Sequence, residues 1–176
     1  MEETTQFPKE IKNQGIVYRD RNQIVEKILV IFEDFVKEFF VARTGKRAAL
    51  VVANDRKILF VRQYRLLIND LSYEIPGGKV NENEPPVEAA ARETEEETGI
   101  YCEDIKPLID YHYGLDIVDN YTYLFYSHSV KKIKDKEATN FVWIPLEECF
   151  SMIKERKIID SLSIIAIYSY ERIMQQ

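Results

Sequence analysis

The chain has 176 residues, 45% of them hydrophobic, which is enough for one well-buried core and leaves little room for two independent ones. Its formal charge of −6, with one short basic run at residues 131–136, argues against a nucleic-acid partner. Cys102 and Cys149 show neither metal-ligand spacing nor a disulfide framework, and no apolar run reaches the roughly 18 residues of a membrane span, so we expect a cytoplasmic protein with no membrane partner.

The N-terminal part of the chain predicts a small sheet. Residues 24–54 contain three runs of β-branched and aromatic residues, broken at 33–34 and 43–45, as is typical of antiparallel strands. Such a sheet has too few strands for a core of its own. We therefore expect a tail and a small antiparallel sheet over residues 1–45, attached to a larger domain over residues 46–176.

Two strands and a helix are predicted next. The strands span residues 57–65 and 71–76, and the second ends at a proline and a glycine pair. The helix spans residues 84–98, because small or apolar side chains recur there at steps of three and four. These side chains are Val87, Ala90, Ala91, Thr94 and Thr98. Two prolines suit the first turn of this helix, and Gly99 suits its C-terminal cap.

The rest of the chain adds strands and then helices. Periodicity predicts strands at residues 105–113, 120–130 and 139–146. It predicts helices at residues 146–157 and 158–174. This order, mostly strands with helices interspersed, indicates an α+β fold.

Five glutamates crowd the helix between residues 88 and 97. Like charges three or four residues apart destabilise a helix by a few tenths of a kcal/mol per pair, so the crowding needs an offset. Glu93 and Glu97 lie one turn apart on the same stripe and can converge on one point, while Glu96 lies to their solvent side. Hard cations such as Mg²⁺ take oxygen ligands and keep waters or substrate phosphates in the remaining positions. The helix therefore predicts an open metal site, the alternative being an acidic surface helix.

The residues around the helix fit the same site. Gly77 and Gly78 allow a sharp backbone turn that brings a carbonyl oxygen close to the ion. Arg92 has many acidic neighbours, so we expect it to position carboxylates rather than to bind ligand. Glu84 is expected to orient Arg92 through a buried ion pair.

Residues 78–100 resemble the Nudix box, Gly-x5-Glu-x7-Arg-Glu-U-x-Glu-Glu-x-Gly-U, in which U is apolar. Eight of the nine defined positions match at the required spacing. They are Gly78, Glu84, Arg92, Glu93, Glu96, Glu97, Gly99 and Ile100. Thr94 departs from the pattern and offers a methyl and a hydroxyl group where the family prefers a larger apolar side chain.

The resemblance implies a Nudix fold, an α/β/α sandwich around a mixed β-sheet. It also implies hydrolysis of a nucleoside diphosphate linked to another group, with Mg²⁺ or Mn²⁺ as cofactor. In this interpretation Glu93 and Glu97 are metal ligands, Glu96 is a ligand or the partner of one, and the Gly77 carbonyl is a further ligand. Arg92 joins the three glutamates in the catalytic set.

Outside the box, residues 14–172 are similar to the ADP-ribose pyrophosphatase branch of the family, through "VRQYR" before "YEIPGG", "FVWIPLEE" and "IIDSLSIIAI". This similarity implies that Arg65, Glu74 and Gly78 contact the bound nucleotide, although Arg65 can equally form a salt bridge at its strand end. It also places a catalytic glutamate in the loop before the "WIPLEE" strand, at Glu137. The alternative for Glu137 is a solvent-facing loop residue with no role.

Members of this branch often exchange the N-terminal sheet between subunits, which implies a homodimer. The implied reaction converts ADP-ribose to AMP and ribose 5-phosphate. The loop "YHYGLDIVDN" lacks a proline that many ADP-ribose hydrolases carry. Another nucleotide sugar, a dinucleotide or a nucleoside triphosphate therefore remains an alternative substrate, and a non-catalytic Nudix domain that senses a ligand is the other alternative.

Overall fold

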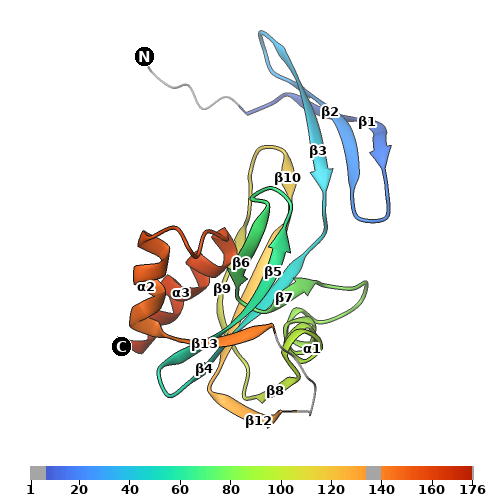
Figure 1. Cartoon of the computed structure of the whole chain (residues 1–176). Helices are drawn as coiled ribbons and strands as arrows, with labels where there is room; N and C mark the ends of the chain where they lie inside the picture. The colour runs from blue at the N-terminus through green and yellow to red at the C-terminus, as the bar shows by residue number, and fades with distance from the viewer. Residues whose placement is uncertain (1–6, 134–139, 176) are drawn as a thin grey trace. The chain divides into compact units, whose positions relative to one another are not determined.

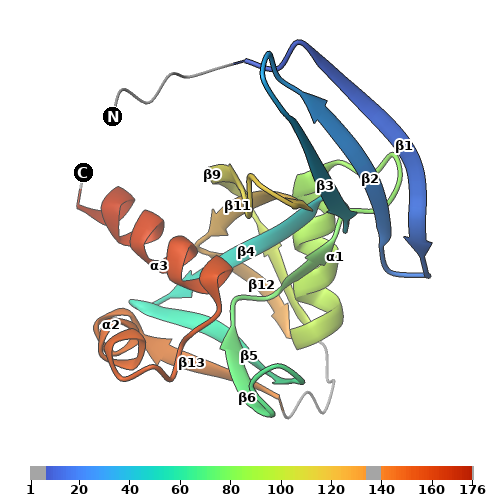
Figure 2. The same cartoon turned by 90° about the horizontal axis from the view of Figure 1, so that it is seen from above.

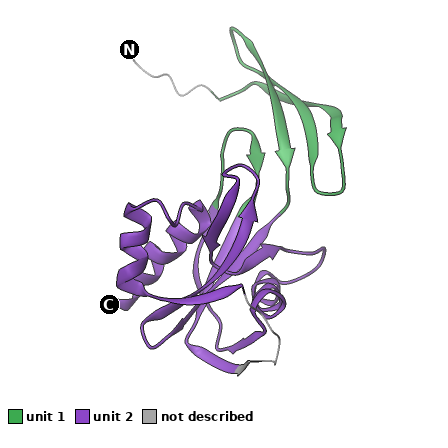
Figure 3. Ribbon diagram, in the orientation of Figure 1, with its two compact units in different colours: residues 1–45, 112–121 green, residues 46–111, 122–176 purple. Residues whose placement is uncertain are grey.

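The computed structural model describes residues 7–133 and 140–175, and the chain divides into two compact units (Figures 1 and 3). Unit 1 comprises Met1–Gly45 with His112–Tyr121, and unit 2 comprises Lys46–Tyr111 with Thr122–Gln176. The predicted domains, 1–45 and 46–176, differ from these units in placing residues 112–121 with the larger part.

Unit 1 is a sheet of four strands in the order β1-β2-β3-β10. The strands are β1 (Glu10–Arg19), β2 (Ile24–Ile31), β3 (Val36–Arg43) and β10 (Val118–Asp119). Strand β1 was not predicted, because its register with β2 shifts at two places and breaks the simple alternation of side chains. One shift lies at Gly15, where φ is 102° and the backbone N–H donates to Asn13 Oδ1.

Unit 2 is built on a mixed sheet with the main order β13-β5-β4-β11-β9. Strands β4 and β11 are parallel, whereas β5 pairs antiparallel with β4, β6 and β13. A separate pair, β12 and β8, is antiparallel. The strands are β4 (Arg47–Asn54), β5 (Lys57–Arg65), β6 (Asp70–Glu74), β7 (Gly77–Lys79), β8 (Ile100–Glu103), β9 (Lys106–His112), β11 (Tyr121–Ser127), β12 (Ser129–Ile133) and β13 (Phe141–Pro145).

Helices cover both faces of this sheet: α1 (Pro86–Thr98) on one side, α2 (Leu146–Lys154) and α3 (Ser161–Met174) on the other (Figures 1 and 2). Strand β4 is apolar at six consecutive positions for this reason. Ala48, Leu50 and Val52 pack in the cluster on the α1 side, and the alternate residues pack in the cluster on the α2–α3 side. The predicted sandwich of helices around a mixed sheet is confirmed.

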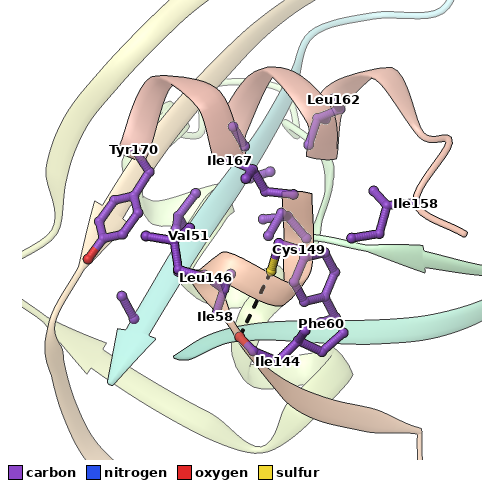
Figure 4. Close-up of a cluster of buried hydrophobic side chains, with 14 of the residues drawn as sticks. Val51, Ile58, Phe60, Ile144, Leu146, Cys149, Ile158, Leu162, Ile167 and Tyr170 are labelled. Atoms are coloured by element: carbon purple, nitrogen blue, oxygen red, sulfur yellow. Dashed lines mark hydrogen bonds between the residues drawn. The ribbon is translucent and has the colours of Figure 1, made fainter. Parts of the chain in front are cut away.

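The core beneath α2 and α3 joins residues that are distant in sequence (Figure 4). Phe60 and Ile58 from β5 meet Ile167 from α3, and all three side chains are fully buried. The Cys149 thiol donates to the Ile144 carbonyl at 3.9 Å, and Cys102 is likewise buried with a free thiol.

None of the helices in the described part of the chain is long and apolar enough to cross a lipid bilayer.

Helix α1 begins two residues later than predicted, at Pro86, and ends as predicted at Gly99. Gly99 has φ of 72° and its N–H donates to the Glu95 carbonyl. The buried stripe includes Ala89, which was not predicted, and Thr94, which departs from the Nudix pattern. The Thr94 hydroxyl donates to the Ala90 carbonyl at 2.8 Å, so the buried polar group is satisfied within the helix.

Candidate active site

The candidate site lies where α1 packs against strand β7. Gly77 of β7 pairs with Ala49 of β4, and a Cβ atom added at Gly77 would lie 2.4 Å from the Ala49 Cβ and 2.6 Å from the Ala48 carbonyl oxygen. No side chain fits there. The backbone of β7 is therefore held against the sheet on one side and open to the carboxylates of α1 on the other.

Glu97 is fixed by two donors that lie outside α1. The Gly77 N–H donates to Glu97 Oε2 at 3.1 Å, and the Gln63 side-chain amide donates to Oε1. Burial raises the pKa of Glu97, and the negative charges of Glu93 and Glu74 raise it further. The two hydrogen bonds act in the opposite direction but do not cancel this rise. The site thus holds a buried carboxylate close to two others, an arrangement that a bound cation would relieve.

Glu93 lies directly over Gly78. A Cβ atom at Gly78 would come within 2.4–2.5 Å of the Glu93 carboxyl carbon and both of its oxygens. Only 17% of the Glu93 side chain is exposed, and Arg92 donates to its Oε1 at 2.8 Å. Glu93 and Glu97 therefore lie against the two successive glycines of β7, and the convergence of their carboxylates on one metal ion stays a prediction.

Arg92 organises the acidic side chains at the edge of this site. Its guanidinium donates twice to Glu84, at 2.7 and 3.1 Å, and also to the Lys79 carbonyl at 3.0 Å. It reaches Glu96 at 3.2 Å, where 59% of the Glu96 side chain is exposed. The predicted ion pair between Arg92 and Glu84 is formed, and it lowers the pKa of Glu84 to about 2, helped by the Asn81 N–H.

Arg65 and Glu74 form a second charged pair on the same face of strand β5 as Gln63. Arg65 Nε donates to Glu74 at 2.6 Å, and a second guanidinium N–H donates to the other carboxylate oxygen. Burial opposes ionisation of Glu74, but the hydrogen bond and charge of Arg65 outweigh it and lower the Glu74 pKa. The salt bridge considered for Arg65 is therefore present, and its contact with nucleotide stays a prediction.

The residues present fit a hard cation in part. Across residues 7–133 and 140–175, no three His, Cys, Asp or Glu side chains are gathered into a ready-made metal site. Glu93 and Glu97 nevertheless offer carboxylate oxygens beside a half-buried stretch of glycine backbone. That donor set suits Mg²⁺ or Mn²⁺, which commonly bind one or two protein carboxylates and complete their coordination with water and substrate phosphate.

One residue of the site was not predicted from the sequence, and one predicted residue lies outside the described part of the chain. Gln63 was not predicted, although it precedes Arg65 by two positions and the alternation of a strand puts both side chains on one face. That spacing was the available signal. Glu137, predicted as a catalytic glutamate, lies outside the described residues.

The chain is similar to known proteins over most of its length. Residues 43–162 match the family model described as the NUDIX domain. Over 137 residues the chain is 32% identical to a methanol dehydrogenase activator of Bacillus methanolicus and 26% identical to an ADP-ribose pyrophosphatase of Bacillus subtilis (strain 168), covering 74% of each chain in both cases. The crystal structure of an ADP compounds hydrolase matches with a TM-score of 0.82 over 97% of both chains at 16% identity, which confirms the fold.

Replacing Glu84 with Gln should reduce the loss of folding stability that occurs as the pH falls. The folded-state pKa of about 2 lies below the ordinary value of 4.5, so ionised Glu84 stabilises the fold above pH 4.5 and loses this effect as the pH falls towards 2. We expect E84Q to be less stable than wild type at pH 6 and to approach it towards pH 2. Urea unfolding at several pH values measures this, with E82Q as the control; parallel curves for E84Q and wild type would contradict it.

Replacing Gly78 with Ala should displace the Glu93 carboxylate without unfolding the protein. The three atoms nearest to the added methyl group all belong to the flexible end of the Glu93 side chain. We expect Mn²⁺ affinity to fall by about tenfold or more, because the ligand geometry is disturbed. Calorimetric titration measures the affinity, and the control is G114A, whose Cβ meets Val118 only at 3.5 Å. Wild-type Mn²⁺ affinity in a folded G78A variant would show that Glu93 does not ligate the metal.

Proposed function

Because the chain belongs to the Nudix hydrolase family, we propose that it hydrolyses the diphosphate bond of a nucleoside diphosphate linked to a sugar, with ADP-ribose as the preferred substrate. The observation that carries this proposal is the packing of the Glu93 and Glu97 carboxylates against the Gly77–Gly78 backbone, inside the segment that matches the family. The products from ADP-ribose would be AMP and ribose 5-phosphate.

In this proposal Glu93, Glu97 and the Gly77 carbonyl hold Mg²⁺ or Mn²⁺. The bound ion supplies neutralisation of the diphosphate charge and a more acidic water molecule. Glu97 is kept in place by Gln63 and the Gly77 N–H, so its carboxylate does not need to reorganise when the cation enters. Its proximity to the other carboxylates favours a cation over any anion at this point.

Arg92 has a positioning role in the proposed reaction. Its ion pairs hold Glu84, Glu93 and Glu96 together, although their like charges repel one another. Glu96 lies at the exposed end of this group and completes the acidic lining of the site. We retain Glu137 as a candidate general base on the family resemblance alone.

ADP-ribose is preferred for two reasons. The Bacillus subtilis relative is named as an ADP-ribose pyrophosphatase. In addition, the Arg65–Glu74 pair lies near enough to Glu97 for their charges to interact, so it can contact the part of the nucleotide next to the diphosphate. Other nucleotide sugars, dinucleotides and nucleoside triphosphates are the alternative substrates, and ligand sensing without catalysis is the alternative function.

Replacing Glu97 with Gln should abolish most hydrolysis while the protein stays folded. The substitution keeps the shape of the side chain and removes the charge that holds the cation, so we expect turnover to fall by at least about 100-fold. The assay should follow phosphate esters released from ADP-ribose, other nucleotide sugars and dinucleotides with Mg²⁺. E88Q, which removes an exposed glutamate of the same helix, is the matched control.

Two results would contradict parts of the proposal. Wild-type turnover by E97Q would remove Glu97 from the mechanism. Hydrolysis of another nucleotide with no release of AMP from ADP-ribose would replace the substrate, and no hydrolysis of any tested nucleotide would favour the sensing function.

We further propose that unit 1 forms a homodimer contact. Within its described residues no apolar side chain is buried, and several large ones are exposed on β1 and β3. These include Ile11, Ile16, Val17, Tyr18, Val36 and Phe40. A sheet of this size without a buried face gains stability by association, because its apolar side chains are then removed from water.

Replacing exposed apolar side chains of unit 1 with charged ones should dissociate this dimer. We expect the wild-type chain to sediment as a dimer and the double variant Ile11→Glu/Phe40→Glu to sediment as a monomer, since burying either carboxylate in a contact is costly. Lys12→Glu changes the charge of the same strand without removing apolar surface and should remain dimeric. A monomeric wild-type protein at about 50 μM, well above the usual range of stable dimer affinities, would contradict the proposal.

A further inference from the structure

The β5–β6 hairpin has one face towards the candidate active site, and a pocket lies on its opposite face. The alternation of β5 places Gln63 and Arg65 towards the candidate active site, and Arg62 on the opposite face. Arg62 pairs with Tyr73 of β6 across the hairpin. Both side chains line a pocket that is completed by the loop between α2 and α3.

The charge of this pocket is opposite to that of the chain. Arg62, Arg156 and Lys157 line it together with one carboxylate, Asp70, whereas the whole protein carries −6. Lys157 forms an exposed ion pair with Glu155 at 2.7 Å. Among the residues that the structure describes, neither arginine side chain forms an ion pair. Two guanidinium groups are therefore available to an anion.

The backbone of the α2–α3 loop is anchored beside its basic residues. Ile158 is fully buried in the core, and the Lys157 N–H donates to the Met152 carbonyl at 2.8 Å. Arg156 has φ of 61°, a conformation that a glycine adopts at lower cost. A basic residue can also suit the negative end of α2, but this does not explain Arg62, which comes from a strand.

Apolar side chains form the rest of the lining. Ile68, Leu71 and Ile159 are 40%, 51% and 43% exposed, and Tyr73 is half-buried beside them. The pocket has a volume of about 420 Å³, within the range of roughly 300–1,000 Å³ of pockets that hold small molecules. A ligand that fits this lining carries a compact anionic group and an apolar or aromatic body.

We propose that this pocket binds a small phosphomonoester with an aromatic or apolar group, at a site separate from the carboxylates of α1. The planar guanidinium groups of Arg62 and Arg156 match phosphate oxygens through paired hydrogen bonds, and Lys157 adds a third cation. A phosphomonoester carries close to two negative charges at neutral pH, which suits the two guanidinium groups of the lining that form no ion pair with any described residue. The site does not depend on the proposed hydrolytic function.

Phenyl phosphate is a suitable probe, because it has no nucleotide part and can be titrated in the presence of EDTA. Amide chemical shifts of the full-length protein should change at residues 62, 73, 156 and 157 as phenyl phosphate is added. The double variant Arg62→Gln/Arg156→Gly should bind about tenfold more weakly or worse, because it removes both forks of hydrogen bonds. Glycine at 156 relieves the positive φ, so this variant should fold.

The matched control is Lys57→Gln/Lys106→Gln, which lowers the net charge by the same amount at exposed sites outside the pocket. It should bind phenyl phosphate within about twofold of wild type, since surface charges more than a Debye length from a ligand are largely screened. Three outcomes would overturn the proposal: no shift changes in wild type, changes confined to Gln63, Arg65 and Glu97, or equal weakening by both double variants.

Discussion

The candidate site depends on two close approaches of strand β7 that its glycines permit, one to the backbone of β4 and one to the Glu93 side chain of α1. Gly77 has no room for a Cβ because Ala49 and the Ala48 carbonyl lie against it, and Gly78 has none because the Glu93 carboxylate lies over it. The backbone amide of Gly77 then reaches Glu97 directly. A side chain at Gly77 would force β7 away from β4, and one at Gly78 would displace the Glu93 carboxylate, so either change would disturb the contacts that orient the two carboxylates.

Crowding acidic groups in this way requires a positive charge to hold them before any cation is bound. Arg92 supplies it, with bonds to three glutamates and to the Lys79 carbonyl. Glu97 lies outside this group of ion pairs and depends on Gln63 and Gly77 instead. In one part of the acidic cluster the charges are therefore neutralised by Arg92. In the other part, around Glu97, burial and neighbouring negative charge oppose ionisation.

The β5–β6 hairpin presents different chemistry on its two faces. One face carries Gln63, Arg65 and Glu74 towards the carboxylates of α1, and the other carries Arg62 and Tyr73 towards the α2–α3 loop. A strand that is covered on both sides near its start, as β5 is at Ile58 and Leu59, emerges from the core with its alternation intact. Two sites of opposite charge can therefore share one rigid element.

The sequence by itself determined the α+β class, the position of α1 within two residues and the carboxylates that this helix carries, because helical periodicity and the spacing of the box are local properties. It did not predict β1, whose register shifts interrupt the pattern, or the grouping of residues 112–121 with the N-terminal sheet, which is a long-range pairing. Only the tertiary structure decided that Gln63 fixes Glu97, that Arg65 pairs with Glu74, and that Arg62 and Arg156 line one pocket. Those contacts join residues 9 to 94 positions apart, and their partners are chosen by how the sheet folds back on itself rather than by neighbouring residues.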